Sequence, residues 1–432
     1  MQKNISILLL CTVASAFAAD SGSLTLSDCI SRARATSLKM TTAKLSERSA
    51  VVELDAARSD RYPTLSAKLN QTLYDSPFND AAQDHYRLSA GLSGSMTLWD
   101  GGATGLTIES RQLDLQTSKY NTDMAALSLT ESVMNAYVTL LASMEKRTQA
   151  TDALALSDSV LQYNVKLLAA GSAMRKDSIL AASDVATNRV DSISAAQTET
   201  SSRTTLRQLL EFPRGDSLKV DSSEMKYDSP AAMGELPDFE TIMKDARASY
   251  PGLLADSVAL LAAHKEETLA HRNNSVTVTL GADATTGFQA WESDRYANQM
   301  KVGYTHSVTL GITVPIIDKG QTTAKVLNAQ VASEKAEVTR QETDKTLENE
   351  MEQLYLQAVS ADASWNAAII QRDAREEAFR VADEQYRAGS LGYTDYLERK
   401  NELESARRTL TQVKYSSILA RDLLDLYRGK YK

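Results

Sequence analysis

The strongest constraint in this sequence is an internal repeat at a constant offset of 218 residues. Six landmarks recur at that spacing: two turn motifs, a tyrosine, an aspartate, an arginine and a leucine. They pair as Trp99-Asp100-Gly101-Gly102 with Ile317-Asp318-Lys319-Gly320, Tyr137 with Tyr355, Ala170-Gly171-Ser172 with Ala388-Gly389-Ser390, Asp177 with Asp395, Arg189 with Arg407, and Leu206 with Leu424. Unrelated helical segments drift out of register over such a distance, so we interpret the chain as a tandem duplication of one long unit.

The repeat predicts four parts in the 432 residues. Residues 1–19 combine a basic start, a short apolar run and an Ala-x-Ala site, which is typical of a cleaved signal peptide. Residues 20–211 and 238–432 are the two repeats, and each is expected to run helix, β-hairpin, long helix, helix. Residues 212–237 contain several Ser and Asp residues and three prolines, which predicts a connector that lies against the body.

Composition narrows the class of protein. Asp and Glu exceed Lys and Arg by 9, and no dense basic patch with interleaved aromatics occurs, so we expect no nucleic acid partner. Gly and Pro number only 18 and 7, which is typical of long helices. Beyond the signal peptide, no apolar run approaches the roughly 20 residues of a membrane helix. Cys29 is the only cysteine of the mature chain, and we expect a buried apolar side chain there.

Two segments, residues 64–98 and 276–316, change from helical to alternating periodicity. Each predicts two strands of about ten residues around a polar loop, and therefore a β-hairpin. One face of each hairpin is apolar, and the other carries mainly Thr, Ser, Asn, Asp and Gly. The apolar positions are Leu65, Ala67, Leu69, Leu73, Tyr86, Leu88, Ala90, Leu92, Met96 and Leu98 in the first hairpin, and Val276, Val278, Leu280, Ala282, Ala284, Val308, Leu310, Ile312, Val314 and Ile316 in the second.

A hairpin with one apolar face fits either a β-sandwich or an outer-membrane barrel whose apolar face meets lipid. Strand length and aromatic residues in or near the strands, such as Trp99, Trp291, Phe78 and Tyr304, favour the membrane. Four strands cannot close a barrel, and an open edge in hydrocarbon leaves backbone groups unpaired. A membrane hairpin pair therefore requires several copies of the chain. Two copies supply eight strands with a filled interior, and three supply twelve with an open lumen.

Each repeat also predicts one very long helix, over residues 103–169 and 321–387. At 1.5 Å per residue, such a helix reaches about 100 Å. Apolar residues step by three and four along each helix, which predicts a coiled-coil seam. The seam positions are Leu129, Val133, Ala136 and Leu140 in the first helix, and Leu347, Met351, Leu354, Ala358, Ala361, Trp365 and Ala368 in the second. Residues 24–57 predict one further helix. An ordinary coiled coil remains an alternative for each helix considered alone.

Three motifs together resemble TolC-like outer-membrane efflux proteins over essentially the whole mature chain. They are Val314-Pro315-Ile316-Ile317-Asp318-Lys319-Gly320, the turn that runs from Glu384 to Glu398, and Asn401-Glu402-Leu403-Glu404-Ser405-Ala406. The resemblance implies a mainly α fold with a small β part, in which three copies share a twelve-stranded transmembrane β-barrel and a periplasmic α-barrel. It implies the outer membrane of a Gram-negative-type cell. It also implies the channel of a tripartite efflux or type I secretion system, with an adaptor protein and an inner-membrane transporter as partners.

The resemblance assigns expected roles to turn residues. The adaptor-docking turns contain Gly171, Ser172, Gly389, Ser390 and Leu391. The periplasmic aperture contains Asp177, Asp395, Glu398 and Tyr386, and the barrel-to-helix turns contain Asp100, Gly102, Pro315, Asp318 and Gly320. In three copies, the aperture carboxylates form a negative ring that favours cations. Leu391 replaces an arginine common in the family, so a Tyr-Arg-Asp latch requires Arg387 or Arg175 instead. The alternative is that these residues only cap helices and solvate the tips.

The sequence does not suggest an enzyme. Its four histidines, His85, His264, His271 and His306, are scattered, and no phosphate loop, nucleophile elbow or zinc motif occurs. We therefore expect no cofactor, no metal and a passive conduit whose energy comes from a partner. A secreted or periplasmic coiled-coil scaffold or adhesin is the alternative function. The cargo is open among antibiotics, metal ions, siderophores and secreted polypeptides.

Overall fold

The computed structural model describes residues 23–74, 85–172, 174–213, 218–221, 223–272, 274–289 and 294–430. The expected signal peptide and the aromatic residues Phe78 and Trp291 lie outside these ranges. The helices are α1 Leu26–Thr36, α2 Leu38–Ser59, α3 Ala103–Ala169, α4 Arg175–Leu209, α5 Phe239–Ser249, α6 Pro251–Arg272, α7 Tyr296–Val302, α8 Gln321–Arg387 and α9 Tyr393–Tyr427. The strands are β1 Thr64–Tyr74, β2 His85–Trp99, β3 Thr277–Gln289 and β4 Thr305–Thr313, and two short 3-10 helices span Ser223–Met225 and Pro230–Met233.

The described chain forms two compact units, and each unit draws on both repeats. The first unit comprises the described residues up to 41, 125–249 and 348–430. The second unit comprises the described residues of 42–124 and 250–347. The long helices α3 and α8 contribute to both units. Each sequence repeat is therefore split between the units, because its hairpin and its distal helices pack with the corresponding parts of the other repeat.

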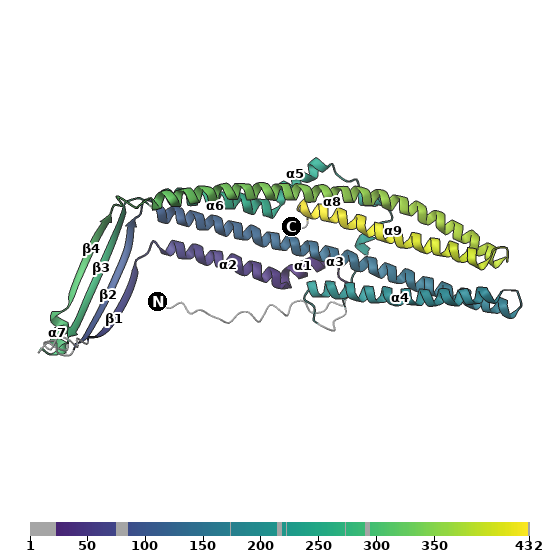
Figure 1. The fold of residues 1–432 in the computed structure, drawn as a ribbon, viewed down its shortest axis with the longest axis horizontal. Coiled ribbons are helices and arrows are strands. Elements are labelled where there is room, and N and C mark those ends of the chain that lie inside the picture. The colour runs from purple at the N-terminus through teal and green to yellow at the C-terminus, as the bar shows by residue number, and fades with distance from the viewer. Residues whose placement is uncertain are drawn as a thin grey trace. The chain divides into compact units, whose positions relative to one another are not determined.

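The second unit contains an antiparallel sheet with the order β1-β2-β3-β4 (Figure 1). The register sets Ala67 opposite Leu92, Leu92 opposite Ala284 and Ala284 opposite His306, so one face is largely apolar across all four strands. Ser66, Ser93, Asp283 and Ser307 form the corresponding row of the other face. The predicted hairpins and their two-faced alternation are therefore confirmed.

The sequence prediction missed a helix break, the end of a strand and a short helix. The expected helix over residues 24–57 breaks at Ser37, which has extended backbone between α1 and α2. The strand expected to reach Ile316 ends at Thr313, and Pro315 lies in the irregular segment that follows. Proline has no backbone N–H to donate to a sheet, which is a physical reason for the early end. The short helix α7 between β3 and β4 was not predicted.

The core of the first unit surrounds the predicted helical seams. Leu129, Val133, Ala136 and Leu140 of α3 are buried. Of the seam residues on α8, all but the half-buried Leu354 are also buried. Trp365 and Tyr137 are among the largest fully buried side chains. The apolar Cys29 joins this core as expected.

Described residues of the connector contact the helices of the unit that contains Trp365. Leu24 and Val220 form a parallel β-bridge, and the Arg421 guanidinium donates to the carbonyl oxygen of Gly234 at 2.7 Å. Arg203 donates to the carbonyl oxygen of Leu218. Leu218 is buried, so the bond from Arg203 satisfies a carbonyl oxygen that water does not reach, and both arginines attach the connector to the helices.

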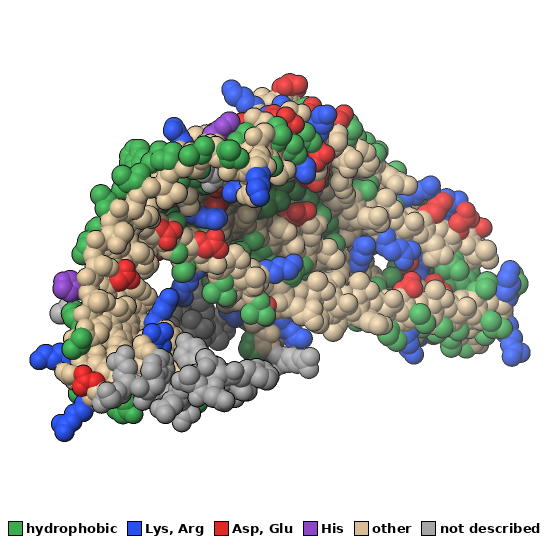
Figure 2. Space-filling view, turned by 60° about the vertical axis from the view of Figure 1, so that its left-hand side comes forward, with side chains coloured by type: hydrophobic (Ala, Val, Ile, Leu, Met, Phe, Trp, Pro, Cys, Tyr) green, Lys and Arg blue, Asp and Glu red, His purple; other side chains and the backbone are tan. Residues whose placement is uncertain are grey.

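Charged and hydrophobic side chains both lie on the surface of the helices. Figure 2 shows basic and acidic side chains interspersed on the face in view, without a large area of one sign. Among the described helices, none combines the length and the apolar character that crossing a membrane requires.

Candidate functional site: the helical tips and their polar network

Two turns with the same geometry join the long helices to their partners, α3 to α4 and α8 to α9. In the second turn Gly389 has φ +75°, Gly389 N–H donates to Tyr386 O at 3.0 Å, and Ser390 N–H donates to Gln385 O at 2.9 Å. Gly171 has φ +73°, and the first turn has the matching pair of bonds, from Gly171 to Leu168 and from Ser172 to Leu167. This is the Schellman arrangement, which favours glycine because its left-handed backbone strains other residues. The repeat therefore preserves a C-cap at each tip.

The proposed aperture carboxylates lie just beyond these turns. Asp177 and Asp395 occupy the first turns of α4 and α9. Asp395 and Glu398 are exposed, and Asp177 is half-buried. A carboxylate near a helix N-terminus is stabilised by the unpaired N–H groups of the first turn, so helix capping also accounts for the two aspartates. Leu391 lies half-buried in the second turn, beside this group.

Tyr386 is buried, and its hydroxyl donates to Asn164 Oδ1 of α3 at 2.5 Å. Burial raises the pKa of this hydroxyl, and the bond to Asn164 opposes that rise. Arg387 pairs instead with Asp383 of its own helix at 2.8 Å. The structure therefore joins Tyr386 to an asparagine, and Arg387 does not take part in a Tyr-Arg-Asp arrangement with it.

A cluster of tyrosines surrounds that hydrogen bond. The ring centroid of Tyr386 lies 4.6 Å from that of Tyr396, 5.8 Å from that of Tyr393 and 6.0 Å from that of Tyr163. Offset and edge-on ring contacts of this kind are favourable beyond their buried area. The tip of this unit therefore has its own small core, separate from the seam around Trp365.

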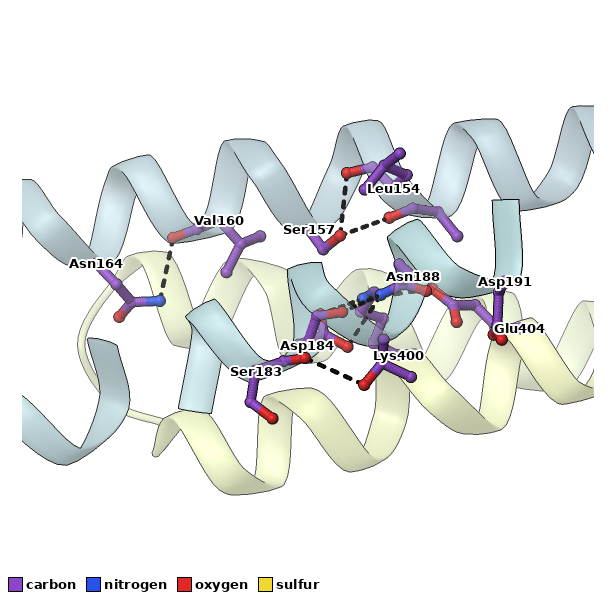
Figure 3. A network of polar contacts seen from close by, with 12 residues as sticks. Leu154, Ser157, Val160, Asn164, Ser183, Asp184, Asn188, Asp191, Lys400 and Glu404 are labelled. Carbon is purple, nitrogen blue, oxygen red and sulfur yellow. Dashed lines mark hydrogen bonds and ion pairs between the residues drawn. The ribbon is translucent and has the colours of Figure 1, made fainter. Parts of the chain in front are cut away.

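The strongest polar feature of the unit is a buried lysine, which the sequence analysis did not identify. Lys400 of α9 is 1% exposed, and its Nζ contacts Asp184 Oδ2 of α4 at 2.5 Å (Figure 3). Asn188 Nδ2 donates to both the backbone oxygen and Oδ1 of Asp184 at 3.0 Å. A heptad signal was present, because Lys400 lies four residues after Tyr396 and three before Leu403, and both neighbours are buried.

Glu404 adds a second carboxylate to this cluster. Its Oε1 is buried and lies 3.5 Å from Lys400 Nζ. Burial raises the pKa of Glu404, and Lys400 acts in the opposite direction. The buried Lys400 ammonium thus faces the carboxylates of Asp184 and Glu404. Its shorter contact is with Asp184, which belongs to the first repeat, whereas Lys400 and Glu404 belong to the second.

A cavity of about 790 Å³ opens beside this cluster, between α3, α4, α8 and α9. Lys400, Asn188 and Glu404 contribute to its wall. The other charged lining residues are of both signs: Lys146, Arg380, Arg407, Arg408, Asp152, Asp191, Glu376 and Asp383. Apolar side chains, among them Leu156, Phe379 and Leu403, also line the cavity. Among the described residues, no group of three or more His, Cys, Asp or Glu side chains is placed to hold a metal.

The turns at the opposite ends of α3 and α8 also match each other. Asp100 accepts hydrogen bonds from the N–H groups of Gly102 at 3.0 Å and Thr104 at 2.7 Å. Asp318 accepts the equivalent bonds from Gly320 at 3.0 Å and Thr322 at 2.7 Å. Gly102 and Gly320 have φ +87° and +81°. Each aspartate thus organises a strand-to-helix turn whose conformation requires glycine.

Comparisons with known proteins agree with this architecture. A family model described as outer membrane efflux protein matches residues 29–211 and 243–429, one segment for each repeat. No curated relative matches the sequence.

Solved structures with the same fold cover nearly the whole chain. The open state of the Neisseria gonorrhoeae MtrE outer membrane channel has a TM-score of 0.76 at 21% identity, over 93% of this chain and 88% of that one. The outer membrane protein VceC of Vibrio cholerae has a TM-score of 0.75 at 16% identity, over 94% and 97%. The Campylobacter jejuni CmeC outer membrane channel has a TM-score of 0.75 at 16% identity, over 94% and 85%.

Proposed function

We propose, since this chain belongs to the outer membrane efflux protein family, that it is the outer-membrane channel of a tripartite efflux or type I secretion system. In this function, the protein is a passive conduit that carries substrates from an inner-membrane transporter to the outside. A periplasmic adaptor protein joins the two. The protein performs no chemistry and binds no cofactor, and the transporter supplies the energy.

The main observation that supports this proposal is the exposed apolar face of the four-stranded sheet. Its apolar face exposes Leu65, Leu69, Val308, Leu310 and Ile312, which is costly in water and favourable in lipid. Its edge strands β1 and β4 each have one paired side among the described residues. Unpaired backbone groups are not tolerated in hydrocarbon, so edge strands of neighbouring copies must pair. Three copies supply twelve strands, enough for an open lumen.

The helical tips supply the periplasmic end of the conduit. In this proposal the turns at Gly171-Ser172 and Gly389-Ser390-Leu391 dock the adaptor. Asp177, Asp395 and Glu398 of three copies surround the aperture. The hydrogen bond from Tyr386 to Asn164 holds the end of α8 against α3 next to these carboxylates. Residues 20–211 and 238–432 then make equivalent contributions to the wall, joined by the connector at 212–237.

Single-channel recording in planar bilayers tests the conduit and its aperture together. Neutralising the acidic residues with Asp177→Asn and Asp395→Asn should lower cation conductance and weaken cation preference, because the field that attracts cations to the aperture is reduced. A matched double variant at exposed carboxylates away from the tips, Asp60→Asn with Glu240→Gln, should leave both quantities unchanged. Absence of channels in the unmodified protein contradicts the conduit. Unchanged conductance in the tip variant contradicts only the acidic ring.

A further inference from the structure

We propose that the apolar face of the sheet carries a binding site for one anionic lipid, in which a groove across β1, β2 and β3 holds an acyl chain and polar groups beside α7 bind a phosphate headgroup. The site rests on the proposed function, because that function brings this face into contact with lipid. It adds a defined place that retains one class of lipid, as distinct from the lipid that touches the whole face.

The groove is a hollow of about 420 Å³ in the apolar face. The strand register sets its residues in two neighbouring rows across β1, β2 and β3. Small side chains form its bottom and large ones its sides: Ala67, Ala90, Ala284 and Thr286 at the bottom, and Leu69, Leu92 and Tyr304 at the sides. Lys68, Gly91 and Thr285 also border the hollow, and strand alternation places them on the other face. A flexible hydrocarbon chain suits this groove, because it fills the space that the small side chains leave.

Helix α7 lies at one end of the groove, where β3 is connected to β4 (Figure 1). The Thr286 hydroxyl, which belongs to the groove, donates to the carbonyl oxygen of Met300 at 2.5 Å. The ring centroid of Tyr296 lies 4.5 Å from that of Phe288, which follows Thr286 on the same face of β3. Both contacts hold α7 against the apolar face. The groove therefore ends at a helix that is fixed to the sheet.

Groups that can bind a headgroup lie at the same end. His306 is opposite Ala284 in the register, so an imidazole occupies the otherwise apolar face. Its ring centroid is 5.8 Å from that of Tyr304, and both side chains are exposed. Lys301 directly follows Met300 and is also exposed, and no carboxylate of the described residues pairs with it. Such groups are unfavourable beside hydrocarbon unless a polar partner meets them, and a lipid headgroup supplies that partner.

The charges beside the groove favour an anionic headgroup. Lys301 and Arg295 are exposed at the two ends of α7, and Asp294 offsets one of these positive charges. A phosphate accepts hydrogen bonds from the ammonium of Lys301, the imidazole of His306 and the hydroxyl of Tyr304. A zwitterionic headgroup brings a second cation toward the same groups. The site therefore prefers a phospholipid with net negative charge.

Native mass spectrometry of the full chain in detergent tests this preference. Delipidated protein receives either phosphatidylglycerol or phosphatidylcholine with identical acyl chains, and the lipid that remains bound is counted as the collision energy rises. We expect one phosphatidylglycerol per chain to persist after all phosphatidylcholine has dissociated. Equal loss of the two lipids at the same energy overturns the site.

Filling the groove tests the place of the acyl chain. Ala90→Leu with Ala284→Leu occupies the hollow with side chains that remain favourable in lipid, so the fold should persist and the retained phosphatidylglycerol should disappear. Ala282→Leu is the matched control, because it adds the same group to the same face outside the groove. Retention that is unchanged in the double variant, or lost equally in the control, overturns the groove as the binding place.

The headgroup contacts need their own variants. Lys301→Gln with His306→Gln should weaken phosphatidylglycerol binding about fivefold or more, as expected for removing a lysine beside anionic lipid, and leave phosphatidylcholine binding unchanged. Lys325→Gln, at an exposed lysine of α8, should change neither. Excess inorganic phosphate should not displace the lipid, since it lacks the acyl chain. Displacement by phosphate identifies a site for free anions and overturns the lipid site.

Planar-bilayer recording separates this site from the proposed function. Unmodified protein that forms channels but retains no phosphatidylglycerol overturns the lipid site and leaves the conduit intact. Protein that neither enters bilayers nor retains lipid overturns both.

Discussion

Lys400 is a charged side chain that lies almost fully buried between helices. A buried ammonium loses its hydration, and the attraction of one partner rarely exceeds that loss by much. Here Asp184 supplies a short contact, Asn188 orients Asp184, and Glu404 adds a more distant charge. A buried ion pair of this kind adds little net stability compared with apolar residues. Removing one partner is costly, because the other charge remains buried.

This reasoning predicts a non-additive mutant cycle. Asp184→Leu alone should lower the free energy of unfolding of the helical part by about 3–5 kcal/mol, because it leaves Lys400 without its closest partner. Combining it with Lys400→Met should restore most of the loss, because no unpaired ammonium remains. Thermal or denaturant unfolding followed by circular dichroism measures the cycle.

Asp191→Leu on the same helix is the control for this cycle. Asp191 faces Arg408 at 3.8 Å, and both side chains are about half exposed. A surface pair of this type contributes less than about 1 kcal/mol. A double variant whose loss equals the sum of the two single losses would show that Lys400 and Asp184 act independently.

At the scale of elements, each of the two kinds of turn occurs once in each repeat, with the same hydrogen bonds or the same glycine conformation. Both strand-to-helix turns use an aspartate that accepts bonds from the N–H groups two and four residues later, and both tip turns use a glycine C-cap. Such turns depend on neighbours in sequence, so the repeat reproduces them. The contacts of α4 and α9 depend on distant partners, and there the two repeats diverge.

The turn at Asp100 gives a prediction with a defined pH dependence. Burial raises the pKa of Asp100, but hydrogen bonds from Thr104, Gly102 and Ala103 outweigh burial and hold it below the ordinary value of 3.8. A lowered carboxyl pKa contributes stability that is present above the unfolded-state value and lost as pH falls through the folded-state value. Asp100→Ala should therefore cost about 1 kcal/mol at neutral pH and progressively less in acid.

Unfolding of Asp100→Ala and the unmodified protein at pH 7 and at successively lower pH values measures this difference. Asp100→Asn is the informative control, since its side-chain oxygen can still accept one of the turn's hydrogen bonds. It should lose less stability than Asp100→Ala at pH 7. A loss by Asp100→Ala that stays constant into acid would contradict the role of the ionised carboxylate.

At the scale of the whole molecule, one copy leaves two sets of surfaces incomplete. The sheet has open edges at β1 and β4, and its apolar face exposes large side chains. The helices also expose large apolar side chains, including Leu356 and Ile370 of α8 and Val190 and Ile193 of α4. The protein belongs to the outer membrane efflux protein family, and under the proposed function lipid and other copies of the chain cover these surfaces.

We therefore expect a membrane-bound oligomer. Fractionation should place the protein in the outer membrane, and detergent extraction followed by light scattering should give three chain masses. Removing detergent should cause aggregation, because the apolar face of the sheet then meets water. A stable, water-soluble monomer would instead support a coiled-coil scaffold.

Local sequence patterns were sufficient to predict much of this architecture. The alternation in the hairpins, the seam through Trp365 and the glycine turns each depend on residues close in sequence, so the sequence alone predicts them. The offset of 218 residues is likewise visible in the sequence, because it compares residue types and not contacts. The break at Ser37 and the helix α7 were not, because short interruptions have weak signals that tertiary packing can override.

Contacts between residues far apart in the sequence could be identified only in the folded structure. The heptad pattern marks Lys400 as facing a neighbouring helix, but it does not say that Asp184, 216 residues earlier, meets it there. Nor does it tell which of two equivalent apolar stripes finds a partner, since Val138 and Leu356 have similar side chains and opposite burial. Burial is a property of what lies across from a residue, and periodicity within one helix carries no information about that neighbour.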